Sequence, residues 1–160
     1  IMKSRHLVAA VSLVFTLAFL SAAQAAEQPM PSPKWQPVQV VSLQLEALRE
    51  NNAANDEGIA AAYKFASTRN KQAVGDLANF RRMLRGGYPD MLTHVAADIE
   101  TVKLEDDEAV IGVTLKLSSK SQHKYLFLLR RNDGEPCDGC WLTDGVIPVQ
   151  RAEPPPLRQI

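Results

Sequence analysis

The chain has 160 residues, with 18 lysines and arginines against 18 aspartates and glutamates, and 46% of its residues are hydrophobic. This length fits one ordinary domain with a real core and excludes two enzymatic domains. The zero formal net charge gives no reason to expect nucleic-acid binding, and the apolar composition excludes collagen-like and disordered classes.

The first 25 residues have the pattern of a secretory signal peptide. Basic residues precede an apolar run from Leu7 to Leu20, and small residues follow at Ala23-Gln24-Ala25. The alternative is a membrane anchor, but the apolar run is short for a bilayer span, which needs about 20 residues. We therefore expect an exported protein, periplasmic or secreted, with no stable membrane anchor after cleavage.

Prolines mark the limits of the folded unit. Four of the ten prolines lie between residues 27 and 37, and three more form residues 154–156. Proline-rich chain favours extended structure and does not pack as helix or sheet. We expect a proline-rich linker over 26–37, one domain over 38–150 and a proline-rich tail over 151–160.

The first half of this domain is predicted to be helical. Apolar residues recur at helical spacing from Val38 to Leu48, which predicts a first helix. Asp56 is expected to cap a second helix that ends at Ser67-Thr68. Asp76 is expected to cap a third, which Gly86-Gly87 ends in a left-handed conformation.

Alternating apolar and polar residues follow Pro89 and predict strands. After a short helical turn at 90–92, the expected strands are Thr93–Leu104, Glu108–Ser118, His123–Arg131 and Cys140–Val149. Short polar connections favour antiparallel pairing. The predicted fold class is α+β, with N-terminal helices packed on a curved four-stranded antiparallel sheet.

Several short motifs follow one another in a recognisable order. They are Gln44–Leu48, Asn55-Asp56, Ala62–Ser67, Phe80–Met83, Gly87–Pro89 and Trp141–Gly145. Together they resemble the exported bacterial family called domain of unknown function 4864, and the layout is similar to the nuclear transport factor 2-like superfamily. The resemblance implies export, a cone-shaped fold with a pocket and a possible homodimer through the outer face of the sheet; it assigns no catalytic residue.

Five aromatic residues are candidates for lining such a pocket. They are Tyr63, Phe65, Tyr88, Tyr125 and Trp141. The alternative is that these rings pack in the core, which is the commoner role of buried aromatic residues.

Cys137 and Cys140 form a C-x-x-C pair, which can be a thiol–disulfide catalyst, half of a zinc site or a structural disulfide. A catalytic pair normally opens a helix after a strand, whereas this pair precedes a predicted strand. His94 and His123 do not have the spacing of a zinc finger with these cysteines. We therefore expect a disulfide that clips a turn, and no metal.

Two sets of charged residues, one basic and one acidic, allow both a functional and a structural interpretation. Arg81, Arg82 and Arg85 near the end of the third predicted helix could bind an anion, or only interact favourably with the helix dipole. Asp98, Glu100 and Asp144 lie on predicted strands and could supply a pocket base beside tyrosines, or face solvent.

No Ser-His-Asp order, phosphate-binding glycine loop or HExxH motif occurs in the chain. We expect no cofactor and no catalytic residue. The first hypothesis is a non-catalytic exported domain that binds a small molecule or a protein. The alternatives are a pocket enzyme of the isomerase or hydrolyase type and a thiol oxidoreductase that uses the cysteine pair.

Overall fold

The computed structural model describes residues 28–150, and the predicted signal peptide, the start of the linker and the tail lie outside this range. Five helices come first: α1 (Pro37–Arg49), α2 (Glu57–Lys64), α3 (Thr68–Val74), α4 (Leu77–Gly87) and α5 (Asp90–Thr93). Four strands follow: β1 (Ala96–Leu104), β2 (Glu108–Lys116), β3 (Gln122–Arg131) and β4 (Trp141–Val149). The predicted α+β class with helices before strands is confirmed.

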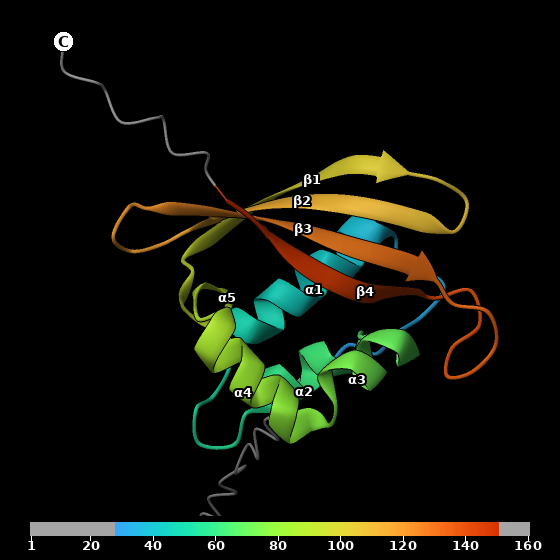
Figure 1. The fold of residues 1–160 in the computed structure, drawn as a ribbon, viewed down its shortest axis with the longest axis horizontal. Coiled ribbons are helices and arrows are strands. Elements are labelled where there is room, and N and C mark those ends of the chain that lie inside the picture. The colour runs from blue at the N-terminus through green and yellow to red at the C-terminus, as the bar shows by residue number, and fades with distance from the viewer. Residues whose placement is uncertain (1–27, 151–160) are drawn as a thin grey trace, which may run out of the picture.

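The strands form an open antiparallel sheet in the order β1-β2-β3-β4. The sheet is twisted, and the helices lie against one of its faces (Figure 1). Between residues 28 and 150, no helix has the length and apolar character needed to cross a membrane.

The core lies between the helices and the inner face of the sheet. Ile111 on β2 pairs with Phe127 on β3, and both side chains are buried. Val41 and Leu45 of α1 are buried in the same cluster. Burial of large aliphatic and aromatic side chains contributes about 1.5–3 kcal/mol each, so this layer dominates the stability of the fold.

Helix α1 begins at Pro37, one residue before the predicted start. Proline suits this first position because its missing N–H would have no helical partner. Gln39 Oε1 accepts a hydrogen bond from Gln36 N at 2.8 Å, as in a capping box. Just before the helix, Trp35 of the predicted linker packs against the core.

The prediction that the second helix ends at Ser67-Thr68 is wrong, because Ser67 begins a further helix, α3. Ser67 Oγ accepts a hydrogen bond from Asn70 N at 3.1 Å, which caps α3. Helix α2 itself ends at Lys64, and Phe65 follows it as a fully buried residue. The chain therefore turns at Phe65–Ser67 and not at the end of a longer helix.

Two further details of the predicted helices are corrected. Asp56 precedes α2, but its side chain does not cap the helix, because it bonds to other side chains. Gly86 and Gly87 lie inside the last turn of α4 and do not have positive φ angles. Within residues 28–150 the glycines with positive φ are Gly75, Gly134 and Gly139.

Candidate functional site

A cavity of about 290 Å³ lies between the helices and the β3–β4 side of the sheet. This volume is near the lower end of the range for small-molecule pockets, about 300–1,000 Å³. The apolar lining comprises Leu48, Ala62, Ala66, Ala73, Val74, Phe80, Met83, Leu84, Met91, Phe127, Gly145 and Val146. The polar lining comprises Gln44, Asn70, Tyr88, Thr143 and Asp144.

A β-bulge places Asp144 in this lining. Leu128 pairs with Gly145 and Leu129 pairs with Thr143, so Asp144 is the extra residue of β4. A bulge redirects a side chain that would otherwise alternate with its neighbours. Asp144 is one of the three strand carboxylates considered as a pocket base; the other two, Asp98 and Glu100, are exposed on β1 outside the cavity lining.

Both oxygens of the Asp144 carboxylate are bonded. Ser67 Oγ donates to Oδ1 at 2.6 Å, Arg130 Nε donates to Oδ2 at 3.2 Å, and Arg69 Nη2 lies 3.3 Å from Oδ2. The Asp144 side chain is only 7% exposed. The bond to Asp144, together with the Glu108 carboxylate, raises the pKa of Arg130. Three of about four acceptor positions on the carboxylate are therefore occupied.

The floor of the cavity holds a buried polar pair, Gln44 and Thr143. Thr143 Oγ1 donates to Gln44 Oε1 at 2.6 Å, and Gln44 Nε2 donates to the carbonyl of Ala62 at 3.1 Å. Buried polar groups are stable only when paired, as here. Sequence reasoning missed both as site residues; a glutamine on the otherwise apolar face of α1 was the available signal.

The more exposed side of the cavity carries Asn70 and Tyr88. Asn70 Nδ2 donates to the carbonyl of Thr143 at 3.0 Å. Tyr88 donates its hydroxyl to the carbonyl of Val146 at 3.2 Å. Both side chains are half-buried, so they mark the mouth of the cavity, while its floor is apolar apart from the buried pair.

Of the five aromatic residues predicted to line a pocket, the structure places Tyr88 in the lining of this cavity. Tyr63 donates to the carbonyl of Gly75 at 2.7 Å, outside the lining. Phe65 and Trp141 are buried residues that do not line it. The sequence could not separate these roles, because the residue type alone does not show whether a ring packs in the core or lines a cavity.

Tyr125 belongs to a second polar cluster, near the start of β3. Its hydroxyl donates to Asp90 Oδ2 at 3.0 Å, and His123 Nδ1 bonds to the same oxygen. Burial is the main cause that raises the pKa of Tyr125 to about 12, and the hydrogen bond to Asp90 is the second cause. The rings of Tyr125 and Tyr88 pack at an angle to each other, with 6.1 Å between their centroids. The cluster fastens α5 to the sheet beside the cavity.

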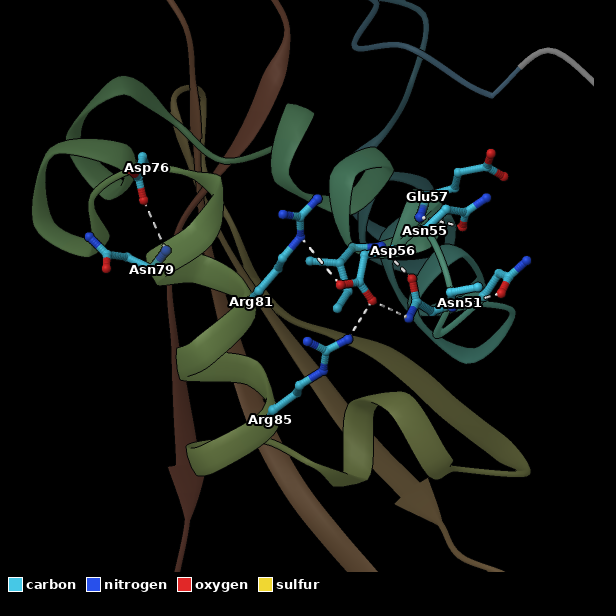
Figure 2. A network of polar contacts seen from close by, with 11 residues as sticks. Asn51, Asn55, Asp56, Glu57, Asp76, Asn79, Arg81 and Arg85 are labelled. Carbon is cyan, nitrogen blue, oxygen red and sulfur yellow. Dashed lines mark hydrogen bonds and ion pairs between the residues drawn. The ribbon is translucent and has the colours of Figure 1, made fainter.

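The predicted anion-binding arginines lie on α4, and two of them bind a carboxylate of the chain itself. Figure 2 shows Arg81 and Arg85 pointing toward Asp56. Arg85 Nη2 donates to Asp56 Oδ1 at 2.6 Å, and Arg81 Nε lies 3.4 Å from Oδ2. Arg82 instead donates to Asn79 Oδ1 at 2.9 Å. Binding of an external anion here stays a prediction.

Asp56 occupies an unusual backbone position, with φ at 55°. Aspartate and asparagine tolerate this left-handed region better than most residues. Asn51 Nδ2 donates to Asp56 Oδ1 at 3.1 Å, beside the arginine contacts (Figure 2). The bond from Asn51 and the charges of the arginines lower the pKa of Asp56. The network ties the α1–α2 turn to α4.

Cys137 and Cys140 form a disulfide in the turn between β3 and β4, with 5.6 Å between their Cα atoms. Cys140 is fully buried and the described chain has no free cysteine. In the chain-entropy account such a short loop contributes about 2 kcal/mol. Among residues 28–150, no group of three or more histidine, cysteine, aspartate or glutamate side chains has the arrangement of a metal site.

The fold and the cavity define a small α+β protein in which helices and an open antiparallel sheet enclose a mostly apolar pocket. The family described as Domain of unknown function (DUF4864) matches residues 33–155, so the chain belongs to this family. Comparison with curated proteins gave no match, and comparison with solved structures gave none.

Proposed function

We propose that this protein is a non-catalytic binding protein for a small, mostly apolar molecule. The observation that carries the proposal is the cavity of about 290 Å³, whose lining is apolar apart from five polar residues. Apolar cavities with a few placed polar groups are the usual sites of small-ligand binding. Met83 and Met91 in the lining have flexible side chains that can adapt to a ligand's shape.

The contacts of Asp144 favour binding over catalysis. An isomerase or hydrolyase of the pocket type needs a carboxylate that can reach a substrate proton. The cavity does bring Asp144 and Tyr88 into one lining, which is the observation in favour of the enzyme. However, Ser67, Arg69 and Arg130 occupy the carboxylate, and the Tyr88 hydroxyl is donated to a backbone carbonyl.

The place of action that we propose is outside the cytoplasm. The signal-peptide pattern of residues 1–25 supports export, and the disulfide of Cys137 and Cys140 fits an oxidising compartment. The disulfide acts in this proposal as a structural clip and not as a redox catalyst, because strand β4 follows the pair directly, and no helix begins there that could lower the pKa of a cysteine thiol.

We further propose that the fold is a member of the cone-shaped nuclear transport factor 2-like class. Its support is the twisted sheet with helices on one face (Figure 1). The cavity between the helices and the sheet is the second support. The opposite face of the sheet carries Ile147, which is 47% exposed, and a second copy bound there would make the homodimer expected from the resemblance.

The binding proposal is tested by calorimetric titration of the protein with 1-octanol. Ala73 on α3 lines the cavity, and Ala73→Trp places a large ring in its mouth without needing buried space, because Ala73 is exposed. Ala78→Trp is the matched control, since Ala78 is an exposed alanine of α4 outside the lining. We expect saturable binding that Ala73→Trp weakens at least tenfold, about 1.4 kcal/mol, and that Ala78→Trp preserves. Equal binding by both variants would overturn the proposal.

A further inference from the structure

The polar groups of the cavity are not distributed evenly. Gln44 and Thr143 at the floor are buried and bonded to each other. Asn70 is half-buried, and Asp144, whose side chain is only 7% exposed, pairs with the exposed Arg69 of α3, which lies just outside the lining. An elongated ligand in this cavity would therefore have its apolar part at the floor and its polar end near Arg69.

The mouth offers hydrogen-bond donors in excess of acceptors. The Arg69 guanidinium has five N–H donors, and within residues 28–150 its one ionic contact is with Asp144. Asn70 Nδ2 uses one of its two N–H bonds on Thr143, which leaves the second without a partner in the described chain. The acceptor positions of Asp144, by contrast, are largely occupied.

Arg69 is also the contact of Asp144 that is most easily released. Its side chain is 72% exposed, and its distance to the carboxylate, 3.3 Å, is the longest of the three contacts. If Arg69 turned to a ligand, Asp144 would retain Ser67 and Arg130. Because the Arg69 end of this ion pair is exposed to solvent, water and salt screen its attraction to Asp144, so Arg69 is the partner that can turn to a ligand.

We infer that the cavity takes an amphipathic carboxylate, whose apolar chain fills the floor and whose head group binds the Arg69 guanidinium and the Asn70 amide. The planar guanidinium matches a carboxylate through paired N–H bonds. A cationic head would have to compete with three existing contacts of Asp144. A neutral hydroxyl head could accept from arginine but has neither the charge nor the second oxygen that matches the paired N–H groups. The inference rests on the proposed binding function, whose ligand class it names.

The test compares octanoate, 1-octanol and octylamine, which share one chain and differ in the head group, by calorimetry at neutral pH. For the unmodified protein we expect octanoate to bind about threefold more tightly than 1-octanol, and octylamine to bind least. Because the contact is exposed and ionic, high salt should remove the preference. Arg69→Ala should reverse it, since dehydrating a carboxylate then has no compensation.

Two variants sharpen the result. Arg82→Ala is the matched control, because Arg82 is an exposed arginine bonded to Asn79 and not to a cavity residue, and it should keep the preference. Asp144→Asn removes the competing charge and should strengthen octanoate binding about threefold with little change for 1-octanol.

The head-group inference and the binding proposal fail in different ways. Equal affinity for octanoate and 1-octanol, tightest binding of octylamine, or a preference that survives Arg69→Ala overturns the carboxylate inference. If 1-octanol still binds and Ala73→Trp still blocks it, the cavity remains the binding site. If none of the three compounds binds, both proposals fail together.

Discussion

Ser67 and Asp144, 77 positions apart in the sequence, are joined by a hydrogen bond of 2.6 Å from Ser67 Oγ to Asp144 Oδ1. The same Ser67 oxygen accepts from Asn70 N and so caps α3. Ser67 N also donates to the carbonyl of Thr143 at 2.9 Å. One residue thus holds the start of a helix against the bulged strand, and this junction forms the polar side of the cavity.

Replacement of Ser67 by alanine should therefore lower the free energy of unfolding. We expect a loss of about 1–2 kcal/mol from the missing cap, with a further loss from the unsatisfied Asp144 oxygen. Urea unfolding followed by circular dichroism measures this change. Ser42→Ala is the control, because Ser42 is an exposed serine of α1, and it should change stability by less than about 0.5 kcal/mol. A Ser67→Ala protein as stable as this control would show that the junction is unimportant.

The buried pair at the cavity floor predicts strong coupling between two substitutions. Thr143→Val removes the hydroxyl and leaves Gln44 Oε1 buried without a donor, which should cost about 1–3 kcal/mol. Gln44→Leu alone should similarly leave the Thr143 hydroxyl unpaired. The double variant should lose less unfolding free energy than the two single variants together, because neither polar group of the pair is then left buried without a partner. Strict additivity in the unfolding free energies would contradict the contact.

The contacts of Asp56 predict how the stability of the fold changes in acid. Its folded-state pKa is lowered below the usual 3.8, so the unfolded chain binds the proton more readily. The stability that this carboxylate contributes is therefore present above pH 3.8 and is lost as the pH falls below it. Asp56→Asn keeps a residue that tolerates the left-handed backbone but removes the charge.

The Asp56→Asn variant should be less stable at neutral pH and should lose less stability on acidification. Thermal unfolding at several pH values between neutrality and the acid range gives both quantities. If the two proteins lose stability in parallel as the pH falls, the pairing of Asp56 with Arg81 and Arg85 does not stabilise the fold.

The buried position of His94 predicts a second effect of pH on stability, at milder acidity. Burial, together with the Arg49 charge, lowers its pKa below the usual 6.5, although bonds to Met91 and Asp90 oppose the shift. The unfolded chain therefore binds the proton first, and stability decreases as the pH falls from about 6.5, by at most about 1.4 kcal/mol per pH unit. His94→Asn, which keeps a donor toward the Met91 carbonyl, should flatten the curve below pH 6.5. A curve that is unchanged in this variant would exclude His94 as its cause.

The strands of the sheet could be predicted from the sequence because the pattern that indicates them lies within each short segment of chain. The alternation of Ile111, Val113 and Leu115 on β2 comes directly from the two-residue repeat of a strand that is buried on one face. Helix α3 could not be read this way, since none of its residues is buried and it depends on the Ser67 cap and on contact with β4. A helix without an apolar face leaves no periodic pattern to find.

The cavity was still harder to predict, because its polar residues are set by tertiary structure. Asp144 enters the lining through the bulge of β4, and Asn70 does so from the unpredicted helix α3. The aromatic candidates were chosen by residue type, which does not reveal whether a ring packs in the core or lines a cavity. Tyr88 was placed in the lining, whereas Phe65 and Trp141 are packed elsewhere.

The most direct test of the account is native mass spectrometry of the protein purified from the exported fraction of its host, before and after addition of 1-octanol. The account predicts one small-molecule adduct per chain, lost in Ala73→Trp and kept in Ala78→Trp, on a polypeptide whose mass shows cleavage after Ala25 and a closed disulfide. An adduct present equally in both variants, or no adduct even with 1-octanol, would contradict the assignment of the cavity as a binding site.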